Sequence, residues 1–172
     1  LRSYTNFYKM KQFIDLNISN ASLRQKALSL GYFEAPNLQV ATLPSHPNAN
    51  AEVIESTNVE LLISACKRRN SNFAFINPLL CNDFYKGTAL LEIAREKQKV
   101  FEIPLRFLLR SPNKSKLMFQ LRIFLKNCLK RKIPFIFTSR ALSEFDLKSP
   151  REIIAIAAAL GLNHEQATAA LS

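Results

Sequence analysis

Apolar residues recur along this chain with two different periods, and the two kinds of pattern alternate. Apolar residues at every second position, or in short continuous runs, predict strands, whereas apolar residues three and four positions apart predict helices. Strands are predicted within residues 13–18, 32–43, 52–56, 73–78, 100–109 and 135–137. Helices are predicted to begin at Ser22, Asn58, Thr88, Lys116, Ser149 and Asn163. This alternation predicts an α/β fold, either a barrel or an open sheet.

The last part of the chain carries the clearest helix signals. Ser149-Pro150-Arg151-Glu152 combines an N-cap serine, a proline suited to the first helical position and a glutamate that can complete a capping box. An apolar helical face follows, and Gly161 is a typical residue after a helix end. Asn163 and Gln166 repeat the cap three residues apart. The pattern predicts a buried strand, a loop and two capped helices.

Pro104 lies inside the apolar run 100–109, which is predicted to be the fifth strand. Proline has no N–H to donate to a neighbouring strand. The run is therefore expected at a sheet edge or at a bulge.

The predicted helix at residues 116–132 contains no acidic residue. Arg122, Lys126 and Lys130 recur every four residues and therefore share one face, and Arg131 extends the charge at the helix end. Such a basic stripe suits a phosphate backbone, which attracts positive charge irrespective of base sequence. The alternative is a solvated face whose cations are favoured by the helix dipole.

Further basic residues lie in loops and at a helix end. In α/β folds, the loops after the carboxyl ends of strands hold most binding sites. The candidates are Arg110, Lys114 and Lys116 after the fifth predicted strand, Arg140 and Lys148 after the last one, and Arg68 at the end of a helix. For Arg68, favourable placement in the helix dipole is an equally good interpretation.

Composition supports a polyanionic partner. The 24 Lys and Arg residues exceed the 13 Asp and Glu residues and give a net charge of +11. A folded domain this basic usually faces nucleic acid, with an anionic membrane surface or simple solubility as alternatives. The length of 172 residues favours one domain, residues 1–172. With three glycines, the chain contains no Gly-rich phosphate loop.

Candidate catalytic residues do not form a recognisable set. Polar residues expected near strand ends are Asp15, Asn17, Glu55, Asn77, Glu102 and Ser139. Asp15 and Glu102 are either paired carboxylates or groups that satisfy backbone donors, of which the second is commoner. His46 and His164 match no metal-ligand spacing, so we predict no catalytic residue, metal or cofactor in the protein.

The three cysteines include no close pair, which favours free thiols in a reducing cytosol. No apolar run approaches the roughly 20 residues of a membrane helix. A cytoplasmic protein without a membrane partner is therefore expected.

The residues of the tail, SPREIIAIAAALGLNHEQATAALS from Ser149, resemble the C-terminus of archaeal ribonuclease P protein component 3, the family of the eukaryotic thirty-kilodalton ribonuclease P subunit. Residues 13–17 and 27–32 resemble the first strand of that family and the helix exit after it. Val100-Phe101-Glu102-Ile103 resembles its Phe-Glu-Ile strand. Residues 43–86 match poorly.

The resemblance implies a TIM-barrel-like fold related to the PHP metal hydrolases, here shortened by one βα unit near residues 70–82. It implies a non-catalytic subunit of ribonuclease P, the endonuclease that removes the 5′ leader from precursor tRNA. Ribonuclease P RNA would hold the catalytic magnesium. Ribonuclease P protein component 2 would be the protein partner, usually in a heterotetramer.

Two alternatives stay open from the sequence. One is a PHP-like metal-dependent phosphoesterase, which would need a His-rich ligand set. The other is a non-catalytic barrel that acts as an RNA or protein interaction module.

Overall fold

The computed structural model describes residues 13–15, 18, 20–36, 39–43, 51–68 and 73–171. Five parallel strands form its central sheet and neighbour one another in chain order. They are β1 (Val40–Thr42), β2 (Val53–Glu55), β3 (Phe75–Asn77), β4 (Val100–Pro104) and β5 (Phe135–Thr138). The predicted α/β fold is confirmed, and all of its strands in the described sheet run in one direction.

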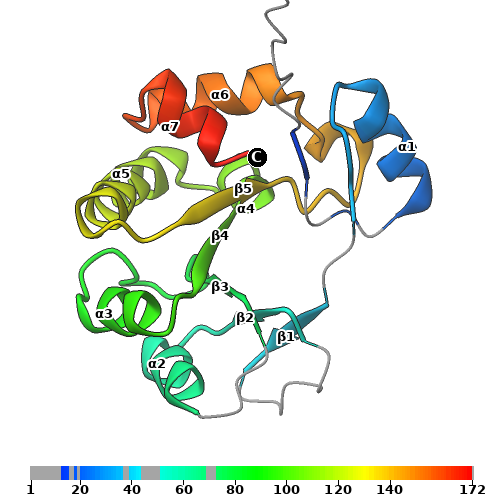
Figure 1. Ribbon diagram of the computed structural model, residues 1–172. Coiled ribbons are helices and arrows are strands. Elements are labelled where there is room, and N and C mark those ends of the chain that lie inside the picture. The colour runs from blue at the N-terminus through cyan, green and yellow to red at the C-terminus, as the bar shows by residue number, and fades with distance from the viewer. Residues whose placement is uncertain are drawn as a thin grey trace, which may run out of the picture.

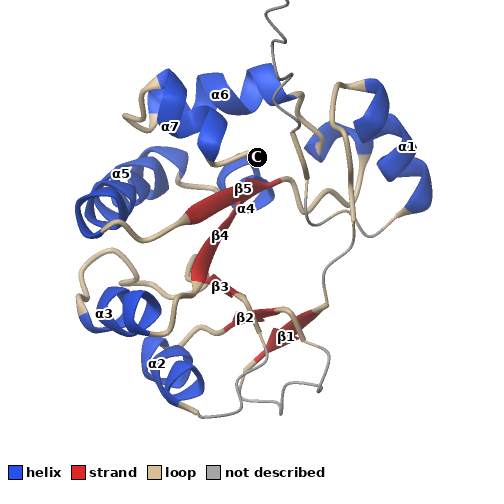
Figure 2. Ribbon diagram, in the orientation of Figure 1, coloured by secondary structure: helices blue, strands red, loops and turns tan. Residues whose placement is uncertain are grey.

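The helices cover the sheet from outside, as parallel strands joined by crossovers require. They are α1 (Ala21–Ser29), α2 (Val59–Lys67), α3 (Ala89–Glu96), α4 (Leu105–Arg110), α5 (Lys114–Arg131), α6 (Pro150–Ala159) and α7 (His164–Ala169), with a 3-10 turn η1 (Glu144–Asp146). Figure 1 shows α2, α3 and α5 along one side of the strands, with α6 and α7 across one end and α1 on the far side from α5. Figure 2 shows the strands in the middle of the molecule, with α2, α3 and α5 on one side of them.

Aromatic side chains fill the space between the sheet and the α5 side. Phe124 of α5 packs edge-on against Phe101 of β4, with ring centroids 4.9 Å apart, and against Phe84, at 5.3 Å. Phe101 and Phe124 are fully buried. Burial of one such side chain contributes about 1.5–3 kcal/mol, so this cluster fixes the position of α5 on the sheet.

Backbone hydrogen bonds continue the sheet beyond β5 towards a barrel. The N–H of Phe137 donates to the carbonyl of Ala170, and the N–H of Ile14 donates to that of Leu171, both at 2.9 Å. Ile14 in turn forms a parallel bridge with Glu34, whose segment leads to β1. Residues 170–171 therefore lie between β5 and the first described segment. Of the predicted strand at 13–18, Ile14 forms a bridge, and Leu16 and Asn17 lie outside the described residues.

The expectation for Pro104 was wrong. The strand β4 lies between β3 and β5 rather than at an edge, and Pro104 is its last residue. Its φ of −70° also suits the start of α4, so the predicted strand ends there and Leu105–Arg110 is helical. A proline at the final strand position removes a donor where the ladder is already ending.

The helix starts agree with the capping signals at α2, α6 and α7 and differ at α1 and α5, while Thr88 lies at the predicted N-cap of α3 but makes no side-chain cap hydrogen bond. The predicted caps at Asn58, Ser149 and Asn163 are confirmed, the last two with full capping boxes. Asn20, not Ser22, caps α1 through its side-chain oxygen, which accepts from the Ser22 N–H at 2.9 Å. The asparagine was overlooked because Ser22 and Gln25 also have capping-box spacing.

The shortening expected near residues 70–82 lies partly outside the described residues. Where that region is described, β3 follows α2 and leads through turns to α3, so strands and helices still alternate. No helix is described between β1 and β2, and residues 44–50 of that connection lie outside the description.

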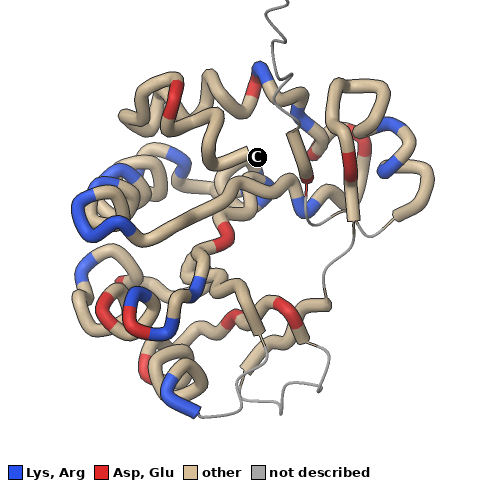
Figure 3. The backbone as a smooth tube through the Cα atoms, in the orientation of Figure 1, with Lys and Arg blue, Asp and Glu red and all other residues tan. Residues whose placement is uncertain are grey.

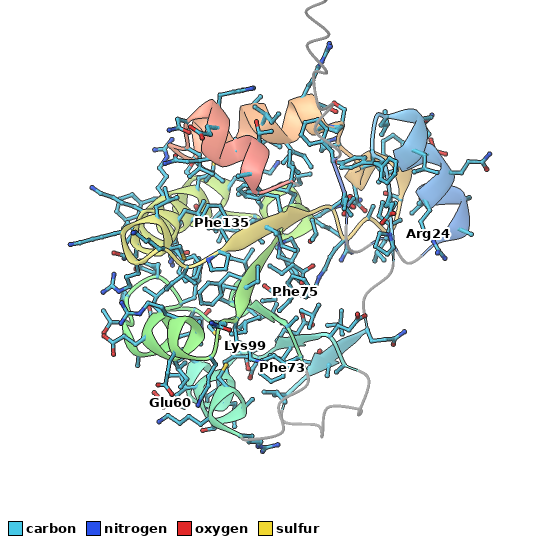
Figure 4. The ribbon with its side chains drawn as sticks, in the orientation of Figure 1. Arg24, Glu60, Phe73, Phe75, Lys99 and Phe135 are labelled. Carbon is cyan, nitrogen blue, oxygen red and sulfur yellow. The ribbon has the colours of Figure 1, made fainter. Side chains whose placement is uncertain are left out.

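A buried lysine fixes the amino end of the sheet. The Lys99 ammonium donates to the carbonyl of Phe73 at 2.5 Å and lies 4.3 Å from the centre of its ring. Figure 4 shows the two residues close together beside α2. Burial lowers the pKa of Lys99. This end of the sheet is thus closed by an internal contact, whereas polar side chains gather at the opposite end.

Candidate nucleic-acid interface and the strand ends

Polar side chains meet at the carboxyl ends of the parallel strands, where barrel enzymes hold their sites. Arg140 follows β5 and is held in the left-handed region with φ of 44°. Its guanidinium donates to Glu55 of β2 at 2.5 Å and to both oxygens of Glu102 of β4, at 2.5 and 3.0 Å. The fork of one arginine therefore joins two strands that are not neighbours in the sheet.

Neutral groups complete this arrangement, which we call the strand-end network. Glu55 also accepts from the Asn77 amide at 2.8 Å and from the Thr42 hydroxyl at 3.0 Å. Glu102 accepts from the Thr138 hydroxyl at 2.7 Å. The side chains of Arg140 and Glu55 are 12% exposed and that of Glu102 is fully buried. Buried charges of this kind are stable only when paired and hydrogen-bonded.

The contacts of the network favour the charged forms of Glu55 and Arg140. Burial alone would raise the pKa of Glu55, but the charge and hydrogen bonds of Arg140, with those of Asn77 and Thr42, outweigh burial and lower it. Burial likewise opposes the charge on Arg140, yet its hydrogen bonds and charge pairing with Glu102 and Glu55 raise its pKa.

Arg140 differs from the other predicted RNA contacts because its guanidinium lies between two buried carboxylates, Glu55 and Glu102. Its role in RNA binding stays a prediction, but the guanidinium is already occupied by two carboxylates. Phe107 of α4 lies over it, with the ring centre 5.9 Å from the guanidinium carbon.

The strand ends do not fit the metals of a PHP-like phosphoesterase. Within the described ranges, no group of three or more His, Cys, Asp or Glu residues is placed to hold a metal ion. Glu55 and Glu102, the carboxylates that come together, enclose a guanidinium instead. Asp15 is separate: its carboxylate accepts from the Ser139 N–H at 3.0 Å, which is the backbone-satisfying role weighed from the sequence. His46 and Asn17 lie outside the described residues.

The predicted basic helix is α5, and it begins two residues earlier than expected, at Lys114, with Asn113 as its cap. We call Arg122, Lys126, Lys130 and Arg131 the α5 basic face. Figure 3 shows Lys and Arg gathered along α5 and at its C-terminal end. Lys126 and Lys130 are exposed and make no hydrogen bond or ion pair with any described residue. Their charges are therefore available to a partner.

Arg122 and Arg131 have partners within the protein. Arg122 donates to the carbonyl of Ala159, from Nε at 3.1 Å and from Nη2 at 2.8 Å. This contact ties α5 to the end of α6 and satisfies a carbonyl that the helix end leaves without a partner. Arg131 donates to the side chain of Asn127 at 3.4 Å.

The other predicted cations lie at three places in the structure. Lys114 and Lys116 are exposed at the N-terminal end of α5, and Arg68 is exposed at the end of α2. Lys148 donates to the carbonyls of Phe145 and Leu147, both at 3.2 Å. Arg110 pairs with Asp146. The structure thus brings the α5 cations together and leaves Arg68 apart.

Asp146 was missed by the sequence reasoning. Its buried carboxylate accepts from Arg110 Nε at 2.9 Å and from the N–H groups of Leu142 and Ser143. Burial would raise its pKa, but these hydrogen bonds and the Arg110 charge lower it. The signal was available, because Ser143 and Asp146 have the three-residue spacing of a capping box, which η1 contains.

The described helices include none that is long and apolar enough to cross a membrane. This finding concerns the helices alone.

Comparisons with known proteins agree with the fold. The family model for RNase P subunit p30 matches residues 14–172. A curated relative, ribonuclease P protein component 3 of Methanococcoides burtonii, is 29% identical over 123 residues, which are 72% of this chain and 46% of the relative. The chain thus spans about half the length of that relative. A chain in a cryo-EM structure of archaeal ribonuclease P with mature tRNA matches with a TM-score of 0.66 and 12% identity, over 92% of this chain and 75% of that one.

Proposed function

This chain belongs to the RNase P subunit p30 family, and we propose that it is a protein subunit of ribonuclease P that supports the catalytic RNA in removing the 5′ leader from precursor tRNA. The observation that carries the proposal is the family match over residues 14–172. The free lysines of α5 support it, because a ribonucleoprotein subunit needs a surface for phosphate.

In this proposal the protein performs no chemistry of its own. The strand-end network places a paired guanidinium where a barrel hydrolase would hold its reacting groups. Magnesium would be held by the RNA subunit, as the family resemblance implies. Ribonuclease P protein component 2 is the proposed protein partner, in a heterotetramer, and the cytoplasm the proposed location.

The decisive experiment is reconstitution of tRNA 5′ processing. Cognate ribonuclease P RNA and component 2 are assayed on precursor tRNA at low magnesium, with and without this chain. We expect cleavage to depend on the chain. Cleavage that is equally fast without it would contradict the proposal. Metal-dependent hydrolysis of a generic phosphodiester by the chain alone would favour the phosphoesterase instead.

A second experiment tests whether the α5 basic face contacts RNA. Lys126→Gln together with Lys130→Gln removes two exposed charges that have no described partner. The slope of log affinity for the RNA against log salt should become shallower by about 1.5, because each phosphate contact contributes about 0.7–0.9.

The matched control removes two charges from another surface. Arg24→Gln with Lys26→Gln alters the exposed side of α1, which Figure 1 places away from α5. This pair should leave the salt slope nearly unchanged. Equal slopes for the two double variants would remove the α5 basic face from the interface.

A further inference from the structure

A cleft of about 340 Å³ is lined by residues that follow β3 and β4, on the side of the sheet where barrel proteins hold most of their sites. Arg106 and Arg110 of α4 line it, one helical turn apart on the same face. Phe107 lines it as well, and its ring also lies over the Arg140 guanidinium. The cleft therefore presents two guanidiniums next to an aromatic side chain.

The Arg106 guanidinium lacks a hydrogen-bond acceptor. Its Nε–H is buried and makes no hydrogen bond with any described residue. The Asp146 oxygen with which Nε pairs is 3.7 Å away, which is beyond hydrogen-bonding distance. A buried donor of a charged group without an acceptor destabilises the fold, so packing alone does not explain an arginine here. The side chain is 35% exposed, so the guanidinium can be reached from the cleft that it lines.

The second guanidinium is held in place by Asp146. The buried Asp146 carboxylate accepts from Arg110 Nε at 2.9 Å and lies 2.8 Å from Nη2, and the N–H groups of Leu142 and Ser143 fix the carboxylate in turn. The Arg110 side chain is 58% exposed, so donors that face away from Asp146 are open to a ligand. Two cations thus share one carboxylate. A further anion would balance the second charge, and phosphate fits the planar fork of arginine best.

Exposed apolar side chains lie on the turn that holds Asp146. Phe145 of η1 is 87% exposed, and Leu142, just before η1, is 62% exposed. Two large apolar side chains on one short turn indicate an interaction site. Proteins that bind single-stranded RNA combine cations that hold phosphates with aromatic rings on which bases stack. Glu144 is the exposed acid of the same turn and would oppose a phosphate nearby.

We propose that α4 and η1 form a binding site for single-stranded RNA, in which Arg106 and Arg110 hold one backbone phosphate and Phe145 stacks on an adjacent unpaired base. Asp146 is a positioning residue, because it fixes Arg110 without contacting the RNA. Phosphate contacts supply affinity, and the exposed ring selects an unpaired position. The inference rests on the proposed function, because it requires an RNA partner. It adds a second surface to the α5 basic face.

The test is fluorescence anisotropy with a labelled single-stranded RNA of about 12 nucleotides, a length within the range of single-strand sites. Binding is measured at several salt concentrations. Arg106→Gln should weaken binding about fivefold or more and make the salt slope shallower by about 0.7, because one phosphate contact is lost. Phe145→Ala should also weaken binding about fivefold or more, but with an unchanged slope, because it removes stacking and no charge.

Matched variants separate these contacts from general effects of charge and surface. Arg95→Gln removes an exposed arginine of α3, which Figure 1 places apart from α4, and should bind as the unaltered protein does. Phe145→Trp keeps a ring for stacking and should retain the affinity. Phe145→Leu keeps an apolar side chain without a ring and should bind as weakly as Phe145→Ala. Glu144→Gln should strengthen binding, because it removes the acid of the turn.

Three outcomes would overturn the inference. One is equal binding by Arg106→Gln and Arg95→Gln. Another is unchanged binding by Phe145→Ala, which decides the matter even if Arg106→Gln does not fold, because Phe145 is exposed. The third is full affinity of Phe145→Leu, which would indicate an apolar surface for a protein segment instead of a stacking ring.

Reconstituted tRNA processing on the same preparations keeps the two proposals apart. Processing that depends on the chain, with RNA binding that none of these variants changes, would reject this site and leave the proposed function standing. Processing that does not need the chain, with RNA binding that the variants weaken as expected, would reject the proposed function and leave the site.

Discussion

The strand-end network and the α5 basic face are two places where charge gathers in this molecule. In the network, one cation is buried between two carboxylates that it contacts directly. On α5, Lys126 and Lys130 point outward and contact no described acid. The same kind of side chain is thus an internal structural element at one place and a free surface charge at the other.

The comparison shows that the burial and the contacts of a charged side chain, rather than its charge alone, determine whether it stabilises the fold or is available to a partner. A buried ion pair depends on both members, because removal of one leaves the other desolvated and unpaired. An exposed lysine without a partner contributes almost nothing to the fold and is available for binding. Variants in the two regions should therefore separate stability from RNA affinity.

The largest effect is expected from Arg140→Met. This change leaves Glu55 and Glu102 buried without their cation, which should lower the free energy of unfolding by about 3–5 kcal/mol. Urea denaturation measures the change. Adding Glu55→Gln and Glu102→Gln to the same chain should restore part of the loss, because the unpaired charges are then gone. A single variant as stable as the original would mean that water already reaches the network.

A smaller loss is expected from Arg122→Met. This variant loses two hydrogen bonds to the Ala159 carbonyl, and because Arg122 is exposed we expect a loss of about 1 kcal/mol. Lys126→Met on the same helix is the matched control and should change stability by less than about 0.5 kcal/mol. Equal stabilities of the two variants would show that the contact between α5 and α6 carries little energy.

Acid should weaken the network selectively. The pKa of Glu55 is lower in the folded protein than its ordinary value of 4.5, so the unfolded chain takes up a proton first as pH falls. The stability that Glu55 contributes is present above about pH 4.5 and is lost as pH falls towards its folded pKa. Glu55→Gln should flatten this part of a curve of unfolding free energy against pH. A slope unchanged by the substitution would contradict the assignment.

The smallest effect on stability is expected from Lys126→Gln with Lys130→Gln. Their side chains contact no described partner, so the free energy of unfolding should stay within about 0.5 kcal/mol of the original. Thermal or urea unfolding measures this value alongside the salt slope. A large loss of stability would mean that the reduced RNA affinity cannot be assigned to lost phosphate contacts.

Local signals in the sequence predicted much of the fold. The caps at Asn58, Ser149 and Asn163 depend on residues two or three positions apart, and the structure has all of them. The basic helix α5 could likewise be predicted, because Arg122, Lys126 and Lys130 recur every four residues. The prediction for Pro104 was wrong because a proline disrupts a strand only from within it. The apolar run 100–109 did not show that the strand ends at Pro104.

The strand-end network could not be predicted in the same way. Arg140 contacts Glu55 across 85 positions and Glu102 across 38, so no spacing in the sequence connects them. Its position after a strand made it a candidate for RNA, as it did for Lys148. Only the packing of the strands shows that Arg140 points inward and contacts two carboxylates.

The hydrogen bond between the Ile14 N–H and the Leu171 carbonyl has a consequence for the order of folding. A chain that leaves the ribosome from its N-terminus can pair β1 to β5 once Thr138 has emerged. The hydrogen bond of Ile14 can form only after Leu171 has been synthesised, more than 150 residues later. Contacts of such long range slow folding, because the intervening loop must be closed first. Residues 13–15 can pair with Glu34 early, but their hydrogen bond to Leu171 should be among the last contacts to form during synthesis.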